Sequence, residues 1–347
     1  MRLRVPHCAH WGAFWLVTEN GRIVDVEPFA GDPSPSPMIR AVKDWMDPRL
    51  RIAEPMAREG WLKQREKSDS SARGRERFVP LGWEEATRLV AGEIDRVRTT
   101  FGNDAIFAGS YGWTSAGRFH HAPTQIRRLM NLVGGYTGHV DTYSYGAGAV
   151  IARHVLGSAD DYLGLGATLD TVIDDGEVLL VFGALSPRTG QIEAGGIARH
   201  LLEDVLRRIA ARGVRIVHVS PRRDDVPRWL DAEWWPIVPG TDAALLIGLV
   251  GEVVSAGLED KDFLERCCSG SDAFLASVRG EGGEARKDAR WASRITDLDA
   301  ERIASLARAV ARQRTFISVS WGLQRAIHGE QPWWAAIALA AATGQIG

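Results

Sequence analysis

Cysteine is scarce in this chain, and its scarcity excludes several kinds of site. Only Cys8, Cys267 and Cys268 occur among the 347 residues. Three unevenly spaced thiols cannot build a disulfide framework or the usual cysteine site for structural zinc. We therefore expect all three cysteines to have a structural role.

A surplus of charge and a long apolar run are also missing. The formal net charge of −2 gives no electrostatic reason to expect nucleic acid or an anionic membrane as a partner. No apolar run approaches the ~20 residues that a membrane span needs. The sequence begins without a twin-arginine or secretory leader, which predicts a cytoplasmic protein, or a periplasmic one if a leader is missing.

Alternating strand and helix patterns dominate the second half of the chain. Continuous apolar runs predict strands over residues 178–182, 214–219 and 315–319. Amphipathic stretches predict helices from about residue 195 to 212, over 242–255 and over 300–312. Such alternation is typical of a parallel sheet covered by helices on both faces. No Gly-x-Gly-x-x-Gly follows the first of these strands, so the ordinary nicotinamide fingerprint is absent.

The first half of the chain has a less regular pattern. A hairpin is predicted where residues 13–17 and 23–26 flank Asn20-Gly21, and apolar spacing predicts helices over 83–98 and 123–133 with a short strand over 105–108. The fold class is therefore α/β, in three regions. We expect a small β-rich region at 1–60, a mixed α/β domain at 61–165 and a doubly wound, Rossmann-like domain at 166–347.

Polar side chains gather where the predicted strands of the last region end. In open α/β sheets, ligands bind beyond the carboxyl ends of the strands. The segments at those ends are rich in hydroxyl, guanidinium and carboxylate groups, at residues 183–188, 220–223, 239–242 and 320–325. Arginine forks suit pyrophosphate and a carboxylate suits guanine or ribose donors. A phosphate-bearing dinucleotide is therefore the expected ligand.

The stretch GSYGWTSAGR at residues 109–118 is the most informative part of the sequence. It is followed by Gly134-Gly135 and by the sequence DTYS at 141–144. Glycines beside the aromatic and hydroxyl side chains allow a cofactor to approach the backbone closely. Taken singly, Tyr-Gly-Trp is typical of packing in a turn, and a serine such as Ser144 is typical of backbone capping.

The ordered set of these segments, together with His10-Trp11-Gly12, closely resembles the serine-ligated molybdopterin oxidoreductases. These are the dimethyl sulfoxide, trimethylamine N-oxide and biotin sulfoxide reductases, and the resemblance covers essentially the whole chain. It implies that Ser144 gives its side-chain oxygen to molybdenum. It also implies that Tyr111 and Trp113 face the oxo group of the metal, as the catalytic pair.

The same resemblance implies a bis-molybdopterin guanine dinucleotide cofactor. The residues expected to bind it are Trp11, Arg118, Ser186, Arg188, Ser220, Pro221, Arg222, Thr241, Asp242, Trp321, Gln324 and Arg325. The lysine that the family carries near the pterin has no clear counterpart, and Arg188 is its nearest substitute. Many molybdopterin enzymes carry a four-cysteine iron–sulfur motif near the N-terminus, where this chain has Cys8 alone. No iron–sulfur cluster is therefore expected.

The activity implied by the resemblance is the two-electron reduction of a small-molecule S-oxide or N-oxide by oxygen-atom transfer. It requires an electron donor, which the sequence does not identify. Family members are much longer and hold a second pterin with a C-terminal domain, so we expect this chain to be the N-terminal part of such an enzyme. Two alternatives stay open: another nucleotide-binding α/β oxidoreductase without molybdenum, and a non-catalytic remnant.

Overall fold

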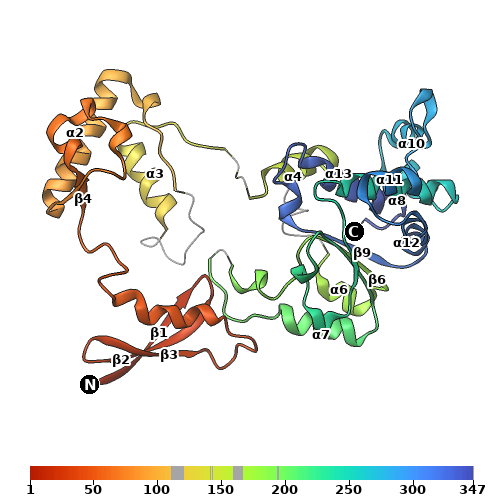
Figure 1. Cartoon of the computed structure of the whole chain (residues 1–347), viewed down its shortest axis with the longest axis horizontal. Coiled ribbons are helices and arrows are strands. Elements are labelled where there is room, and N and C mark those ends of the chain that lie inside the picture. The colour runs from red at the N-terminus through yellow and green to blue at the C-terminus, as the bar shows by residue number, and fades with distance from the viewer. Residues whose placement is uncertain (111–120, 141, 143, 159–166, 194, 347) are drawn as a thin grey trace. The chain divides into compact units, whose positions relative to one another are not determined.

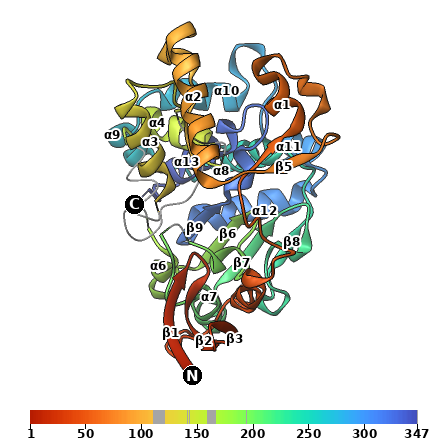
Figure 2. The same ribbon diagram turned by 90° about the vertical axis from the view of Figure 1, so that its left-hand side faces the viewer.

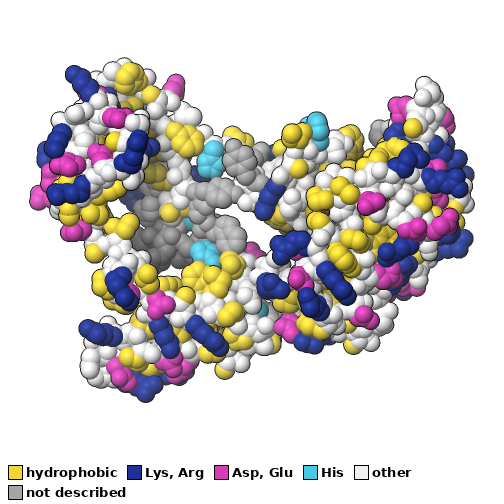
Figure 3. All heavy atoms as spheres, viewed as in Figure 1, with side chains coloured by type: hydrophobic (Ala, Val, Ile, Leu, Met, Phe, Trp, Pro, Cys, Tyr) yellow, Lys and Arg dark blue, Asp and Glu magenta, His cyan; other side chains and the backbone are white. Residues whose placement is uncertain are grey.

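The computed structural model describes residues 1–110, 121–140, 142, 144–158, 167–193 and 195–346 (Figure 1). The chain divides into two compact units, Met1–Val140 with Gln191–His200, and Asp141–Gly190 with Leu201–Gly347. The expected three-region division stays a prediction. On the face drawn in Figure 3, side chains of both charge signs are interspersed over each unit.

Unit 1 begins with an antiparallel sheet of three strands, β1 Arg2–Ala9, β2 Gly12–Glu19 and β3 Arg22–Pro28. The predicted hairpin is confirmed, and both turn residues adopt positive φ, 49° at Asn20 and 77° at Gly21. Phe14 of β2 packs against Ile39 and Val42 of the 3-10 helix η1, Pro37–Met46. This packing gives the N-terminal sheet a small core of its own.

The remainder of unit 1 is largely helical. Its elements are β4 Met56–Arg58, α1 Glu59–Gln64, η2 Arg65–Lys67, η3 Ser70–Ala72, β5 Phe78–Pro80, α2 Trp83–Phe101, η4 Asn103–Ala105 and α3 Ala122–Leu132. The predicted helices at 83–98 and 123–133 correspond to α2 and α3. The predicted strand at 105–108 is wrong, because only Phe107 pairs, in an isolated bridge with Thr137. A four-residue apolar run without a long partner strand gains too few backbone hydrogen bonds to extend.

Unit 2 contains a four-stranded sheet in which all strands are parallel. The strands are β6 Val178–Phe182, β7 Arg215–Val219, β8 Glu233–Trp235 and β9 Thr315–Val319. Their order is β8-β7-β6-β9, which Figure 2 shows from right to left. Every residue of β6 is buried because the strand has a neighbour on each side and helices on each face.

Helices cover both faces of this sheet, which confirms the predicted doubly wound architecture. Leu180 and Phe182 face a core shared with α8 Asp242–Ser255, α11 Ala289–Thr296, α12 Ala300–Arg312 and α13 Glu330–Ala342. Leu179 and Val181 face the opposite core, shared with α6 Leu169–Asp174 and α7 Leu202–Ala211. The other described elements of unit 2 are α4 Gly146–Val155, η7 Arg223–Asp225, η8 Arg228–Leu230, α9 Lys261–Cys267, α10 Ser271–Arg279, η9 Glu281–Gly283 and η10 Trp321–Gln324. The short helix η6, Thr189–Gln191, lies where the chain passes from unit 2 to unit 1.

The helix expected from about residue 195 begins later, at Leu202. Gly195 and Gly196 have φ values of 84° and 94°, which an α-helix does not permit. In addition, the backbone N–H of His200 donates to Asp32 instead of to a helical carbonyl. Residues 191–200 therefore belong to unit 1 although they lie between β6 and α7 in the sequence.

In the part of the chain that the structure describes, no helix combines the length and the apolarity that a bilayer crossing requires.

Candidate cofactor-binding site

The loops after β6 and β9 meet at the carboxyl edge of the sheet in unit 2. The chain runs from β6 to β7 on one side and returns to β9 on the other, so the strand order reverses between β6 and β9. Open α/β sheets bind ligands at such a switch point. The Ser320 N–H donates to the Phe182 carbonyl at 2.8 Å. A Cβ on Gly183, where φ is 82°, would lie 2.4 Å from Ser320 Oγ, so only glycine permits this approach.

Serine hydroxyls shape the loops at three neighbouring strand ends. The Oγ atoms of Ser186, Ser220 and Ser320 each accept from the backbone N–H two residues further on, at 3.4, 3.1 and 3.3 Å. Ser220 Oγ also donates to Asp225 Oδ2 at 2.6 Å. Serine-stabilised turns of this kind fix the backbone locally. The expected binding residues Ser186 and Ser220 therefore stabilise the loops that carry Arg188 and Arg222.

Three arginines expected to bind the cofactor lie exposed on these loops. Arg188 follows Ser186, Arg222 follows the exposed Pro221, and Arg325 follows η10. Arg222 lies 3.7 Å from Asp225, but its side chain is 74% exposed. An ion pair that is open to solvent is weak, so Asp225 competes little with a phosphate ligand for the Arg222 guanidinium group. Guanidinium groups at the carboxyl edge of a parallel sheet suit the phosphates of a dinucleotide.

Asp242 is a buried carboxylate at the start of α8. It is 8% exposed, and burial raises its pKa. The preceding Thr241 uses its hydroxyl to donate to the Val238 carbonyl at 2.7 Å. A carboxylate in this position is stabilised when a ligand supplies N–H or O–H donors.

Gln324 connects the loop after β9 to helix α4. Gln324 is 5% exposed, and its Oε1 accepts from the Gly148 N–H at 2.7 Å. Its Nε2 is buried without a hydrogen-bond partner among the residues that the structure describes. Trp321, at the start of η10, packs edge-on against Tyr145 with ring centroids 4.3 Å apart. The expected binding residues Gln324 and Trp321 thus contact the segment that carries Ser144.

Ser144 lies two residues before the first residue of α4 and is half-buried. Its backbone N–H donates to Thr142 Oγ1 at 3.3 Å, and the Gly146 N–H donates to the Thr142 carbonyl at 2.9 Å. Unpaired N–H groups and the macrodipole at a helix N-terminus favour negative charge nearby. Ser144 therefore lies beside the positive end of the α4 dipole.

Four of the expected site residues precede unit 2 in the sequence. Tyr111, Trp113 and Arg118 lie outside the described residues, so their expected convergence with Ser144 stays a prediction. Trp11 belongs to unit 1, where its ring packs edge-on against Trp45 at a centroid distance of 6.1 Å. Trp11 Nε1 is buried without a hydrogen-bond partner in the described part of the chain.

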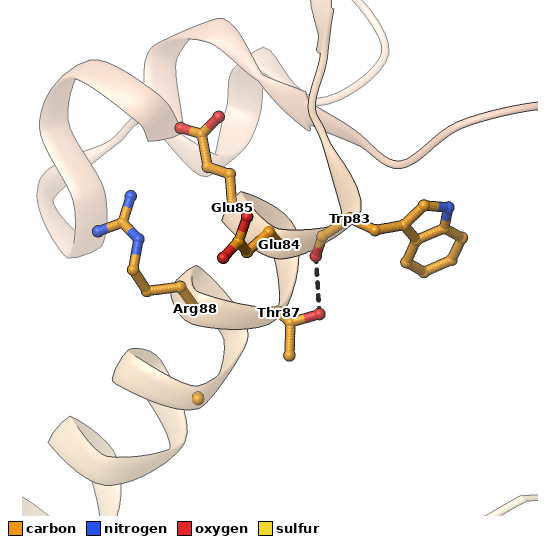
Figure 4. Close-up of a pocket in the computed structure, with 6 residues that line it drawn as sticks. Trp83, Glu84, Glu85, Thr87 and Arg88 are labelled. Atoms are coloured by element: carbon orange, nitrogen blue, oxygen red, sulfur yellow. Dashed lines mark hydrogen bonds between the residues drawn. The ribbon is translucent and has the colours of Figure 1, made fainter.

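A separate surface hollow on α2 contains none of the expected residues. Trp83, Glu84, Glu85, Thr87, Arg88 and Ala91 line it. Figure 4 shows the Trp83 ring pointing away from the two carboxylates, while the Thr87 hydroxyl donates to the Trp83 carbonyl at 2.7 Å. Among the described residues, no cluster of three or more histidine, cysteine or carboxylate side chains could hold a metal ion.

Sequence reasoning missed the contacts that hold Ser144 in place. Gly148 and Tyr145 were not expected to contribute, although both touch expected binding residues. The only signal was the pair of glycines in residues 146–148, a composition that weakens a helix unless another part of the chain approaches closely.

Sequence models for molybdopterin oxidoreductases match nearly the whole chain. The model of the main domain matches residues 50–347, and that of the N-terminal domain matches residues 7–46. The chain belongs to the molybdopterin oxidoreductase family. This confirms the resemblance and, through the family, a molybdenum–molybdopterin cofactor.

Several curated members of this family are similar to this chain over nearly its full length. The chain is 59% identical to the biotin sulfoxide reductase of Cereibacter sphaeroides, with 93% of this chain and 43% of that protein covered. It is 38% identical to the dimethyl sulfoxide/trimethylamine N-oxide reductase of Rhodobacter capsulatus, with 98% and 41% covered. It is 35% identical to the trimethylamine-N-oxide reductase of Haemophilus influenzae, with 99% of this chain and 41% of that protein covered. The chain thus spans about two fifths of the length of these relatives.

A solved structure supports the fold independently. Acetylene hydratase from Pelobacter acetylenicus superposes on 98% of this chain and 43% of its own, with a TM-score of 0.67 and 18% sequence identity. At this identity the likeness concerns the fold alone.

The donor set at the carboxyl edge fits the cofactor of the family. Nε2 of Gln324 is buried without a hydrogen-bond partner among the described residues, the Asp242 carboxylate is buried, and exposed guanidinium groups lie on the same edge. Buried polar atoms without partners are costly, and a bound ligand removes that cost. The residues of this molybdopterin oxidoreductase are thus suited to a polyanionic dinucleotide with a hydrogen-bonding base.

Proposed function

We propose that this chain forms the N-terminal part of a molybdenum-dependent reductase of S-oxides or N-oxides. The observation that carries the proposal is the joining of the Ser144 segment to the carboxyl edge of the sheet through Gln324. The names of the curated relatives, which are sulfoxide and N-oxide reductases, support the substrate class.

The cofactor form that we propose is bis-molybdopterin guanine dinucleotide. Asp242 would accept hydrogen bonds from the guanine edge, because a buried carboxylate favours a partner with paired N–H donors. Arg188, Arg222 and Arg325 would bind the phosphates. The proposal includes no iron–sulfur cluster, since Cys8 stands alone near the N-terminus and four thiolates are needed to hold one.

The bound cofactor supplies two-electron oxygen-atom transfer, and the protein supplies ligation, orientation and exclusion of water. Ser144 would hold the metal through its deprotonated oxygen, which the N-terminus of α4 stabilises. The phenol of Tyr111 would donate a hydrogen bond to the oxygen of the substrate and polarise the bond that breaks. Trp113 would form a flat wall that keeps bulk water away from this oxygen.

The activity also requires groups that this chain does not supply by itself. The relatives are more than twice as long, and we propose that a C-terminal domain of the same kind completes the cofactor cage. An electron donor must reduce the centre after each turnover. We propose the cytoplasm as the compartment.

Metal and nucleotide analysis tests the proposal. The 347-residue chain is purified from a host that makes the molybdenum cofactor, and its molybdenum, pterin, guanine and nicotinamide contents are measured. The account predicts bound pterin guanine dinucleotide, with no more than one per chain, and no turnover of S-oxides or N-oxides. Bound nicotinamide would indicate a different oxidoreductase, and the absence of both cofactors would indicate a non-catalytic remnant.

A further inference from the structure

Helix α4 begins without a capping side chain from its own N-cap residue. Tyr145 is its N-cap residue and makes no side-chain capping hydrogen bond. Two of the first three residues of the helix, Gly146 and Gly148, are glycines, which are poor helix formers. The first N–H groups of any helix lack partners within the helix. A start of this kind requires hydrogen-bond acceptors from another part of the chain.

The loop after β9 supplies that support. Gln324 Oε1 accepts from the N–H of Gly148, the third residue of α4, at 2.7 Å and across 176 positions of sequence. This is the bond that a serine or aspartate N-cap normally provides. The edge-on packing of Trp321 against Tyr145 holds the residue directly after Ser144. Two contacts from one loop therefore fix both ends of residues 145–148.

Close packing leaves little freedom in this arrangement. A Cβ on Gly148 would lie 3.0 Å from Trp333 Cε3 and 3.3 Å from Gln324 Oε1. Figure 1 shows α4 beside α13, the helix that carries the buried Trp333. Since the helix start is enclosed by these side chains, a shift of the Gln324 amide moves the residues before α4 as well.

We propose that Gln324 and Trp321 are positioning residues that set the place of Ser144 relative to the carboxyl edge of the sheet. The inference rests on the proposed metal-ligand role of Ser144. In this arrangement the two ends of the Gln324 amide have separate tasks. Oε1 caps α4, while Nε2, buried without a partner among the described residues, remains available as a donor to a bound ligand.

Hydrogen–deuterium exchange of residues 144–155 tests the positioning role in the chain as it stands, without any cofactor. Gln324→Leu removes the cap, and we expect the exchange rate in this segment to rise about fivefold, as for the loss of a typical N-cap. Gln324→Glu retains an oxygen that accepts from Gly148 and should restore protection. Unchanged exchange in Gln324→Leu, or a failure of Gln324→Glu to restore protection, would overturn the proposal.

A matched control separates positioning from general loosening of the fold. Gln345 Oε1 accepts from the Thr315 N–H at 2.6 Å, and its Nε2 donates to the Val310 carbonyl at 2.8 Å, both near the opposite end of β9. Gln345→Leu should therefore loosen residues 310–316 and leave residues 144–155 protected. If it accelerates exchange in 144–155 as much as Gln324→Leu does, the effect is global and the proposal is wrong.

Trp321 is tested in the same experiment. Trp321→Ala should accelerate exchange in residues 144–155, whereas Trp321→Phe keeps an aromatic edge against Tyr145 and should not. Trp229→Ala is the control, because Trp229 is 40% exposed, as against 41% for Trp321, and packs on Arg207 instead. Equal exchange in Trp321→Ala and in the unaltered chain would remove Trp321 from the proposal.

The failure of this inference can be told from a failure of the proposed function. The exchange experiment contains no metal, and it reports only whether Gln324 and Trp321 hold the segment. Whether Ser144 binds molybdenum is reported separately by the metal content of Ser144→Ala. If protection depends on Gln324 but Ser144→Ala keeps its full molybdenum content, the contact between Gln324 and α4 is supported. The role of Ser144 as a metal ligand is then refuted.

Discussion

Asp32 and His200 form a buried pair that holds residues 191–200 on unit 1. Asp32 Oδ2 lies 2.6 Å from His200 Nδ1, and their side chains are 2% and 5% exposed. Asp32 Oδ1 accepts from the His200 backbone N–H at 2.9 Å. The other ring nitrogen, Nε2, lies 3.1 Å from the Gln191 carbonyl, at the opposite end of the same segment. One carboxylate thus fixes a segment that is 168 positions away in sequence.

Removal of this carboxylate should strongly destabilise unit 1. Asp32→Ala leaves the buried Nδ1 of His200 without its partner, and the free energy of unfolding should fall by about 3–5 kcal/mol, as measured by denaturant titration. Asp25→Ala is the control, because Asp25 pairs with Lys43 on the surface and should leave stability nearly unchanged. Equal stability losses in the two variants would show that the buried pair has no special role.

The same pair predicts a dependence of stability on acid pH. Burial disfavours the Asp32 carboxylate, but the N–H groups of His200 and Ser34 and the His200 ring outweigh burial and lower the pKa of Asp32. The stability that results is fully present above the ordinary value of 3.8 and is lost as pH falls through the lowered pKa. The stability difference between the unaltered chain and Asp32→Ala should therefore shrink below about pH 4, which unfolding titrations at several pH values will measure.

Gly148 should tolerate no side chain. Gly148→Ala places a methyl group against Trp333 and Gln324, and overpacking of this kind typically costs about 1–3 kcal/mol. Gly92→Ala is the matched control in the middle of α2, where a Cβ meets nothing within 4 Å. That change should stabilise the chain by up to about 1 kcal/mol, because alanine is the better helix former. Thermal unfolding of both variants measures the contrast, and a stabilised Gly148→Ala would contradict the packing described for α4.

The ionised Asp242 carboxylate should lower the stability of the cofactor-free chain and should strengthen the binding of guanine dinucleotide. Because burial raises its pKa, the ionised carboxylate destabilises the fold as pH rises from 3.8 through the raised pKa. Asp242→Asn should therefore raise the melting temperature of the cofactor-free chain at neutral pH. It should also lower the retention of guanine dinucleotide about tenfold or more, as for a lost hydrogen bond to a charged group. An unchanged guanine content would exclude Asp242 from the base site.

The sheet of unit 2 could be predicted because its strands are continuous apolar runs. Residues 178–182 and 315–319 are delimited correctly from the sequence, and the first of these strands has no polar position because it is buried on both faces. The three-residue strand β8 gives too short a signal, and the path of residues 191–200 depends on the distant Asp32. Contacts between remote segments leave little trace in local patterns.

The candidate site could likewise be predicted only where local sequence carries the signal. Loops at strand ends carry their polar residues in the sequence itself, so the edge with Asp242 and Gln324 was foreseeable. The cap on Gly148 was not, because a glutamine and a glycine 176 positions apart show no shared pattern. The assignment of Tyr111 and Trp113 still depends on the family resemblance.

Tyr111 should affect the rate of oxygen transfer without affecting metal binding. In a protein that joins this chain to the C-terminal part of the 59% identical relative, Tyr111→Phe removes one hydroxyl. The loss of one preorganised donor typically costs about 2.7–4 kcal/mol in the transition state, or about 10²–10³ in kcat. Molybdenum content should stay unchanged, as metal analysis will report. A variant that loses its molybdenum would show a structural role instead.

The most direct test of the central claim is to compare Ser144→Ala with the unaltered sequence in the same joined protein. Molybdenum content and the reduction of biotin sulfoxide, dimethyl sulfoxide and trimethylamine N-oxide are measured together. The account predicts that the unaltered protein reduces at least one of these compounds. It also predicts that Ser144→Ala, which lacks a metal ligand, loses that activity or retains only a small fraction of it. An unchanged rate in Ser144→Ala would contradict the assignment of Ser144 to the metal and, with it, the proposed function.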